Sequence, residues 1–224
     1  MSEIKKEPKK EIVEIDNSST SLESLLMPKL TNTSSSVISH IGGSSLTTQN
    51  HFAIFCDGAC KNNGKKYAKA GYGLSVQFVN KDSYKECYIL SKPLESSESQ
   101  TNQRAELHAL SDALDIAYKK VNYLAAKLEV SFKNVIIYTD SEYSINCLTK
   151  WGPSWSKKGW KKADGHDVLH LDIIKPMFEN WTKFNSSHND YDIKINHVRS
   201  HTGRTDPISL GNERADELAV LSIS

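Results

Sequence analysis

The sequence predicts an α/β fold in which a five-stranded mixed sheet is flanked by helices. Two observations support this prediction. Short apolar, β-branched runs alternate with longer amphipathic stretches, and the first three of these runs follow one another with only short turns between them. Strands joined by short turns pair antiparallel, whereas a strand reached through a helix can pair in parallel. The sheet is therefore expected to contain both kinds of pairing.

The first three strands are expected to form an antiparallel meander. Residues 52–58 (FAIFCDG) are typical of a buried strand, and residues 71–79 and 84–90 follow after turns that contain Gly and Asn. Apolar residues at helical spacing predict a helix over residues 102–120. The apolar run 134–140 comes directly after this helix, so it should pair in parallel with the first strand through a right-handed crossover.

The rest of the chain is expected to alternate helices with one more strand. A short helix is predicted over residues 141–151, a longer one over 167–184, a strand over 191–198 and a closing helix over 212–221. Pro176 lies inside the longer helix and is expected to kink or break it, because proline removes a backbone donor.

The chain divides near residue 50. Residues 1–50 begin with alternating charges and continue into a stretch rich in Ser, Thr and Asn that contains no aromatic residue. Such a segment cannot bury enough apolar surface to offset the entropy lost on ordering. We expect a disordered tail over residues 1–50 and one folded domain over residues 51–224.

Composition excludes a membrane-spanning protein and does not by itself identify a nucleic-acid binder. No apolar run approaches the ~20 residues that cross a bilayer, and the 224 residues carry a net charge of only +1. The four cysteines show no spacing typical of metal ligands. We therefore expect reduced thiols and an intracellular protein.

Four acidic residues stand in informative contexts. Asp57 and Asp140 end apolar strands, and Glu106 and Asp216 lie on amphipathic helices. Taken singly, the helical acids could be solvated and Asp140 could cap the following helix. However, acids that end buried strands are costly to desolvate without a partner, and ligands collect at the carboxyl ends of strands in open α/β sheets. The four together indicate an oxygen-ligand site for divalent metal.

The segments around these acids resemble a known family. DGACKNNG, TNQRAEL, TDSEYSINCLTKW and HVRSHTG…GNERADELA resemble, in the same order, the signature segments of type 1 ribonuclease H, the endonuclease that cuts RNA in RNA–DNA hybrids. The resemblance covers about residues 51–222. It implies the ribonuclease H fold, two Mg²⁺ ions for which Mn²⁺ can substitute, and 5′-phosphate products. The segment WGPSWSKKGWKKADG matches the basic protrusion of the cellular-type enzymes.

The resemblance also implies a role for each site residue. Asp57 would bridge both metals, Asp216 would serve the metal on the water side, and Glu106 and Asp140 would hold the metal on the leaving-group side. His201 matches the histidine that assists leaving-group protonation or product release.

Residues that bind each strand of the hybrid follow from the same resemblance. Asn63, Asn102 and Gln103 match the positions that contact the 2′-hydroxyls of the RNA strand, and their amides can both donate and accept. The residues expected to bind the DNA strand are Thr101, Trp151, Trp155, Lys157, Lys158, Lys161 and Lys162. Trp160, and also Trp155, could instead anchor the protrusion to the core.

The chain departs from the family pattern at three places. Ser99 stands where an arginine is common, His170 stands where an asparagine is common, and the loop from His201 to Asp216 is extended. The first two departures predict a weaker pocket for a DNA phosphate.

Two alternative identities remain for the chain. It could be the ribonuclease H domain of a reverse-transcribing element, which would normally be fused to a polymerase, or a module that binds hybrids without cutting them. The separate chain and intact protrusion favour the cellular enzyme over the first, and the four retained acids favour cutting over the second. The expected partner is an RNA–DNA hybrid, bound by a monomer away from membranes.

Overall fold

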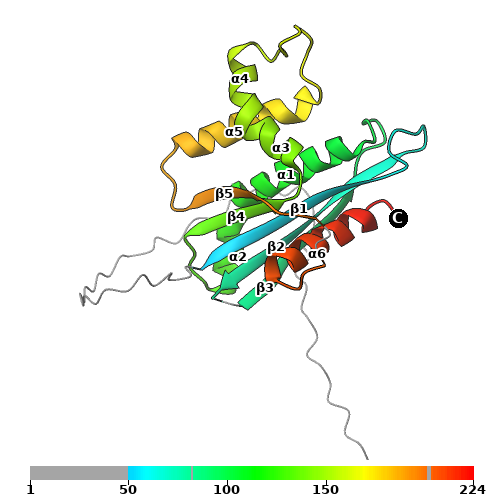
Figure 1. Cartoon of the computed structure of the whole chain (residues 1–224). Coiled ribbons are helices and arrows are strands. Elements are labelled where there is room, and N and C mark those ends of the chain that lie inside the picture. Colours follow the sequence, from blue (N-terminus) through cyan, green and yellow to red (C-terminus); the bar gives the residue numbers. More distant parts are fainter. Residues whose placement is uncertain (1–49, 82, 201–202) are drawn as a thin grey trace, which may run out of the picture.

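The computed structural model describes residues 50–81, 83–200 and 203–224, which form one sheet covered by helices on both faces (Figure 1). The strands are β1 (His51–Lys61), β2 (Lys69–Asn80), β3 (Ser83–Pro93), β4 (Asn134–Thr139) and β5 (Asp192–His197). The helices are α1 (Asn102–Lys119), α2 (Val121–Leu128), α3 (Glu142–Asn146), the π-helix η2 (Cys147–Trp151), α4 (Gly152–Lys157), α5 (Leu171–Ser186) and α6 (Pro207–Leu221).

The sheet has the order β3-β2-β1-β4-β5, with β1 at its centre. Antiparallel pairing joins β1 to β2 and β2 to β3, whereas β1 pairs in parallel with β4, and β4 in parallel with β5. Ile54 of β1, for example, lies opposite Val76 of β2 and Ile137 of β4. The five-stranded mixed sheet and its meander are therefore confirmed.

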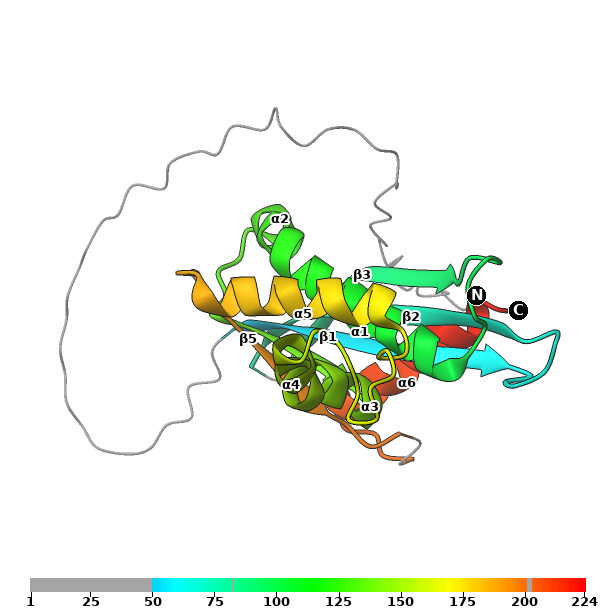
Figure 2. The same ribbon diagram turned by 90° about the horizontal axis from the view of Figure 1, so that it is seen from above.

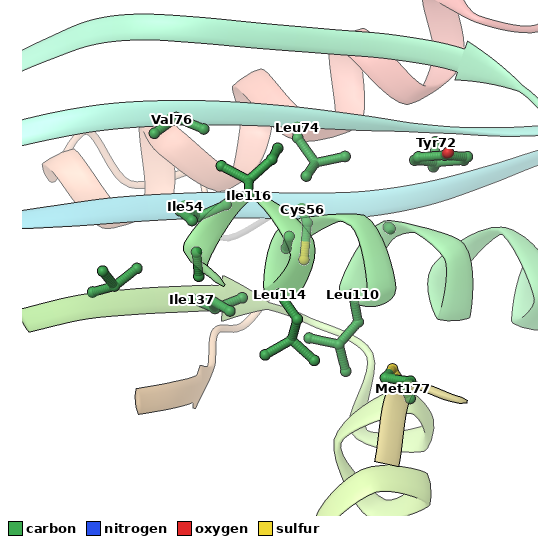
Figure 3. Close-up of a cluster of buried hydrophobic side chains, with 14 of the residues drawn as sticks. Ile54, Cys56, Tyr72, Leu74, Val76, Leu110, Leu114, Ile116, Ile137 and Met177 are labelled. Atoms are coloured by element: carbon green, nitrogen blue, oxygen red, sulfur yellow. The ribbon is translucent and has the colours of Figure 1, made fainter. Parts of the chain in front are cut away.

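The larger core lies between the sheet and α1. Side chains alternate along a strand, and Ile54 and Cys56 of β1 point to the face that α1 covers, where both are fully buried. Leu110 and Leu114 of α1 meet them together with Ile137 of β4 (Figure 3). Apolar residues at helical spacing in α1 thus match apolar residues at every second position of the strands.

The other face of the sheet is covered by α6. Ala53 and Phe55 of β1 form a second cluster with Ala215 of α6, and the ring of Phe55 stacks on Tyr138 of β4 at 5.0 Å. By the same alternation, Asp57 belongs to this second face. The central strand thus carries its carboxylate toward the helix that also carries Asp216.

Several helix boundaries differ from those that the sequence predicted. A separate helix, α2, follows α1, and the segment 141–151 divides into α3 and the π-helix η2. The helix α5 begins at Leu171 and runs through Pro176 without a break, because a proline in the second turn removes only one hydrogen bond from a helix that packs on α1.

The closing helix begins five residues earlier than predicted. Asp206 caps α6 by accepting a hydrogen bond from the backbone N–H of Ser209 at 3.1 Å, and Pro207 occupies the first turn. Both residue types are preferred at these positions. This capping signal, rather than apolar periodicity, sets the start of α6.

Three expectations concern features other than the sheet. The proposed tail lies outside the described residues except for Asn50. The four cysteines are free. Within the described ranges, no helix combines the length and the hydrophobicity required to cross a bilayer.

Two glycines of the central strands let the covering helices approach closely. A Cβ added at Gly58 of β1 would lie 2.4 Å from the backbone nitrogen of Glu106 in α1. A Cβ added at Gly73 of β2 would lie 2.4 Å from the backbone oxygen of Ala215 in α6. Since these contacts are with backbone atoms, a side chain at either position would push a helix away from the sheet.

We predict that Gly58→Ala destabilises the protein by about 3 kcal/mol, because the clashing backbone of α1 cannot rotate away as a side chain could. Gly64→Ala is the matched control. A Cβ there meets no other atom, so the only expected cost is that of placing alanine at the left-handed φ of +78°, which is about 1 kcal/mol. Urea unfolding measures both values, and an equal loss in the two variants would contradict the packing argument.

Candidate active site

Asp57 is a buried carboxylate at the centre of the sheet. Its side chain is only 7% exposed, and Asp57 lies opposite Gly73, a residue without a side chain, on the neighbouring strand. The backbone N–H of Gly58 donates to Oδ1 of Asp57 at 2.7 Å. One hydrogen bond satisfies only part of a carboxylate that can accept about four.

Glu106 reaches the site from the first turns of α1. Thr101 caps this helix by accepting from the backbone N–H of Arg104 at 3.3 Å, which places Glu106 near the helix start. Asn102 donates its side-chain amide to Oε1 of Glu106 at 2.6 Å, and the hydroxyl of Ser141 donates to Oε2. Glu106 is therefore a half-buried, oriented carboxylate and not a solvated helix residue.

Asp140 directly follows β4, the parallel neighbour of β1. The cap of the next helix is Ser141, whose hydroxyl accepts from the backbone N–H of Ser144 at 3.2 Å. The carboxylate of Asp140 is therefore not the cap, and its backbone oxygen contacts Nε2 of His197 at 3.1 Å.

Asp216 faces Asp57 from α6. The two residues line a small pocket of about 50 Å³ together with Asn212. Asn212 precedes Asp216 by four residues, which puts both on one face of the helix. The acids from two strands and two helices are thus brought to one region, around Asp57 within β1 and beside the carboxyl end of β4.

The charges of these carboxylates interact. Burial, followed by the negative charge of Asp140, raises the pKa of Asp57 from 3.8 to about 8, and Asp216 and Glu106 add to the increase. The N–H of Gly58 opposes it. Burial also raises the pKa of Glu106, although the Ser141 hydroxyl partly offsets this. The site is therefore electrostatically unfavourable when all four acids are ionised.

The donor set fits hard divalent cations. Among residues 50–81, 83–200 and 203–224, no three His, Cys, Asp or Glu side chains already stand in a metal-binding arrangement. However, four carboxylates supply the oxygen ligands that Mg²⁺ takes, and cations would relieve their repulsion.

Asn212 is a site residue that the sequence did not single out. Its side chain is 4% exposed, and its Oδ1 is buried without a hydrogen-bond partner among the residues that the structure describes. A buried acceptor left unpaired costs about 1–3 kcal/mol. Asn212 lines the same pocket as Asp57 and Asp216, so a water or a hydrated cation there would satisfy it. Its spacing of four from Asp216 was the available signal.

Two of the three residues matched to RNA-strand binding, Asn102 and Gln103, lie on the same helix as Glu106. Asn102 and Gln103 begin α1, and Gln103 is exposed. Asn63 is exposed in the turn between β1 and β2. Because Asn102 also holds Glu106, the amide that is expected to read the RNA strand is directly connected to a proposed metal ligand.

The protrusion is built from η2, α4 and the loop that follows. The rings of Trp151 and Trp155 lie 5.7 Å apart, and Trp151 also meets Tyr143. Trp160 packs edge-on against Phe178 of α5 at 5.7 Å. Trp160 therefore anchors the protrusion to the core.

The four lysines of the protrusion are not equivalent. Lys161 pairs with Asp167 at 2.5 Å and Lys162 with Asp164 at 3.6 Å, within the same loop. Lys157 and Lys158, at the end of α4, are exposed and take part in none of the ion pairs among the described residues. Lys157 and Lys158 are therefore better placed than Lys161 and Lys162 to bind phosphates.

The region expected to hold a DNA phosphate contains an ion-pair network. Arg104 pairs with Glu98 at 2.7 Å and with Asp172, so carboxylates already occupy its guanidinium. His170 is 9% exposed, and burial followed by the charge of Arg104 lowers its pKa. Ser99 is exposed. His201, the fifth proposed catalytic residue, lies outside the described residues.

Comparisons with known proteins agree with the resemblance. The RNase H family model matches residues 49–224. The chain is 31% identical to ribonuclease H1 of Mus musculus over 166 residues, which cover 74% of this chain and 48% of that protein. It is 32% identical to ribonuclease H of Agrobacterium fabrum over 170 residues, covering 75% and 92%. The chain thus spans about half the length of the mammalian relatives.

Two solved structures share the fold. The RNase H domain of PFV has a TM-score of 0.57 at 24% identity, covering 78% of this chain and 95% of that one. The foamy viral protease-reverse transcriptase in complex with an RNA/DNA hybrid also has a TM-score of 0.57, at 20% identity, covering 89% and 23%.

We predict that Asp57→Asn flattens the pH dependence of stability in metal-free protein. Because the pKa of Asp57 in the folded state is raised, its favourable contribution is present below pH 3.8 and is lost as the pH rises through about 8. The free energy of unfolding of the unsubstituted protein should fall over this interval, and that of the variant should fall less.

Urea unfolding with excess chelator at several pH values measures this difference. Asp190→Asn, at an exposed carboxylate, is the control and should follow the unsubstituted protein. Identical pH profiles for Asp57→Asn and the unsubstituted protein would show that the carboxylates do not repel one another as described.

Proposed function

Because the chain belongs to the RNase H family, we propose that it is an endoribonuclease that hydrolyses the RNA strand of RNA–DNA hybrids. The observation that carries this proposal is the buried carboxylate of Asp57, whose pKa three neighbouring acids help to raise. A structural carboxylate would have several hydrogen-bond donors or an ion-pair partner. Among the described residues, Asp57 accepts one hydrogen bond, from the backbone N–H of Gly58, and the charges that shift its pKa are those of carboxylates, although Arg199 and Arg204 line the same pocket.

Two divalent cations fit this arrangement. In the proposed site, Asp57 would bind both cations, Asp216 of α6 would bind one of them, and Glu106 of α1 and Asp140 after β4 would bind the other. Mg²⁺ pairs of this kind activate water and stabilise the leaving oxygen. The remaining work falls to the protein: Asn102 and Ser141 fix the carboxylate of Glu106, and the sheet holds Asp57 away from bulk water.

We propose that the side-chain amides near the start of α1 select the RNA strand. The side-chain oxygen of Asn102 can accept from a 2′-hydroxyl while its NH₂ donates to Glu106. Recognition of RNA would thereby orient a metal ligand. Gln103 follows Asn102 in α1 and is exposed, Asn63 is exposed in the turn between β1 and β2, and we propose that both contact the same minor groove. On sequence resemblance alone, His201 is proposed to assist the leaving group.

The DNA strand is proposed to lie along the protrusion. The rings of Trp151 and Trp155 supply an apolar surface, and Lys157 and Lys158 supply charge. Thr101 caps α1 with its hydroxyl oxygen, which leaves its O–H free to donate to a phosphate. The site is built within one chain, so we propose that a monomer is active, in an intracellular setting consistent with four free thiols.

A direct assay tests the proposed activity. A hybrid with a labelled RNA strand should be cut in Mg²⁺ or Mn²⁺ to products with 5′-phosphate ends, and chelation should abolish cutting. Labelled single-stranded RNA, duplex RNA and duplex DNA are the controls and should stay intact. Asp57→Asn should lower the rate by several orders of magnitude, since it removes the shared charge. Robust cutting in excess chelator would contradict the proposal.

We predict that Asn212→Ala weakens the stabilisation by Mg²⁺ while leaving metal-free protein as stable as before, or more stable. The substitution removes a buried acceptor to which none of the described residues donates a hydrogen bond. Thermal unfolding in chelator and across a Mg²⁺ titration measures both quantities. A loss of metal-free stability of about 2 kcal/mol, with an unchanged response to Mg²⁺, would instead show a structural asparagine.

We predict that Lys157→Gln/Lys158→Gln lowers the salt dependence of hybrid binding more than Lys161→Gln/Lys162→Gln does. Each lost phosphate contact reduces the log–log salt slope by roughly 0.9, whereas Lys161 and Lys162 are already paired with carboxylates. Binding is measured without divalent metal, so that the RNA is not cut. Equal slopes for the two double variants would contradict the distinction.

A further inference from the structure

The turn between β1 and β2 is strongly basic although the chain as a whole is nearly neutral. Residues 58–81 contain five lysines and no Asp or Glu, against a net charge of +1 for all 224 residues. Four of these lysines lie in residues 61–69, which we call the basic hairpin. They are Lys61, Lys65, Lys66 and Lys69.

The basic hairpin exposes its charge fully. All four lysines are exposed, and the ion pairs formed among the described residues involve other side chains, so no carboxylate there neutralises them. This distinguishes them from Lys161 and Lys162 of the protrusion. Tyr67, at the same tip, is 70% exposed. An exposed aromatic ring among unpaired lysines is typical of a surface that binds nucleic acid.

The tip of the hairpin has a defined backbone. The N–H of Lys65 donates to the oxygen of Asn62 at 2.9 Å, and the N–H of Ala68 donates to the oxygen of Lys65 at 3.1 Å. Asn62 and Gly64 take left-handed φ values of 57° and 78° that these tight turns require. Lys65 and Lys66 are therefore presented on two consecutive turns, and Lys61 and Lys69 on the strands that flank them, rather than on an unstructured loop.

The hairpin is fastened to the segment that begins α1. Oε1 of Gln100 accepts from the backbone N–H of Ala70 at 2.8 Å, and the thiol of Cys60 contacts the backbone oxygen of Gln100 at 3.5 Å. Asn102 and Gln103, proposed to read the RNA strand, follow immediately. The hairpin is thus continuous with the proposed RNA-binding surface and separate from the protrusion that would hold the DNA strand.

The hairpin also lies at a useful distance from Asp57. Both strands extend beyond the ends of α1 and α6, so the tip stands clear of the covering helices (Figures 1 and 2). Four residues separate Asp57 from Lys61 on β1, or about 13 Å at the usual strand rise. One strand of a duplex advances about 3.4 Å per phosphate along its axis, so this distance corresponds to roughly four nucleotides.

We propose that the basic hairpin is a second contact surface for the RNA strand, binding its backbone phosphates beyond the minor-groove contacts of Asn63, Asn102 and Gln103. The lysines supply charge to the phosphates, and the ring of Tyr67 packs on a ribose or an unpaired base of the same strand. This inference rests on the proposed function. A contact at the hairpin predicts that the affinity of the protein for a hybrid grows with the length of the RNA on one side of the cut.

Binding of the full chain to hybrids of two lengths, measured in chelator, tests the proposal. Lys65→Gln/Lys66→Gln should weaken binding to a hybrid of about 20 base pairs by roughly tenfold and lower the salt slope by up to ~2, with little effect on one of about 6. Lys127→Gln/Lys133→Gln removes two exposed lysines at the opposite end of the sheet and should change neither value. A result for Lys65→Gln/Lys66→Gln equal to this control would overturn the proposal.

Tyr67→Ser should weaken binding to the long hybrid at every salt concentration without changing the slope, because it removes no charge. Two partial duplexes, one with an RNA overhang and one with a DNA overhang, show which strand of the hybrid the basic hairpin contacts. Sensitivity to Lys65→Gln/Lys66→Gln should persist with the RNA overhang, and persistence with the DNA overhang alone would overturn the assignment to the RNA strand.

The test separates this inference from the proposed function. The turnover number on the short hybrid should be the same for Lys65→Gln/Lys66→Gln as for the unsubstituted protein, since neither lysine contacts the reacting groups. Absence of cutting by the unsubstituted protein would refute the proposed activity. If the unsubstituted protein cuts the hybrid and Lys65→Gln/Lys66→Gln binds the long hybrid as tightly as it does, only the role of the hairpin is refuted.

Discussion

The close approach of two helices to the central strands is the constraint on which the site depends. Gly58 lets the backbone of α1 touch β1, and Gly73 lets the backbone of α6 touch β2. A Cβ at either position would meet backbone atoms, so neither helix could stay where it is. Without these contacts Glu106 and Asp216 would stand farther from Asp57, and the acids would be separate, solvated residues.

Bringing carboxylates together opposes folding. Burial and neighbouring charge raise the pKa of Asp57, and the buried Oδ1 of Asn212 has no hydrogen-bond partner within the described ranges. Both features are unfavourable in the protein alone, and both are relieved by the same kind of ligand, a hydrated divalent cation. Local instability at one end of the sheet is therefore best explained as preparation for binding, and the apolar clusters on both faces of the sheet offset it.

Among the described residues, the basic groups near the proposed binding surfaces fall into two kinds, those paired with carboxylates and those that take part in no ion pair. Arg104, Lys161 and Lys162 are held by carboxylates, so they stabilise local structure more than they offer charge to a ligand. Lys157 and Lys158 extend from the protrusion without such partners, and the basic hairpin repeats this arrangement on a separate element. A nearly neutral chain can therefore present two positive surfaces, because none of the ion pairs among the described residues neutralises these lysines.

The sequence by itself predicted the five strands and the pairing of the first four, and it pointed to the four acids as a candidate site, since alternation, turn length and position in or after an apolar run are local properties of residues such as Asp57 and Asp140. It did not determine that Ser141 rather than Asp140 caps α3, that Pro176 leaves α5 unbroken, or that Trp160 anchors the protrusion. Nor could it show that Asn212 lacks a partner while Lys161 has one. Desolvation, hydrogen-bond satisfaction and ion pairing depend on which distant segments meet, and only the tertiary structure decides that.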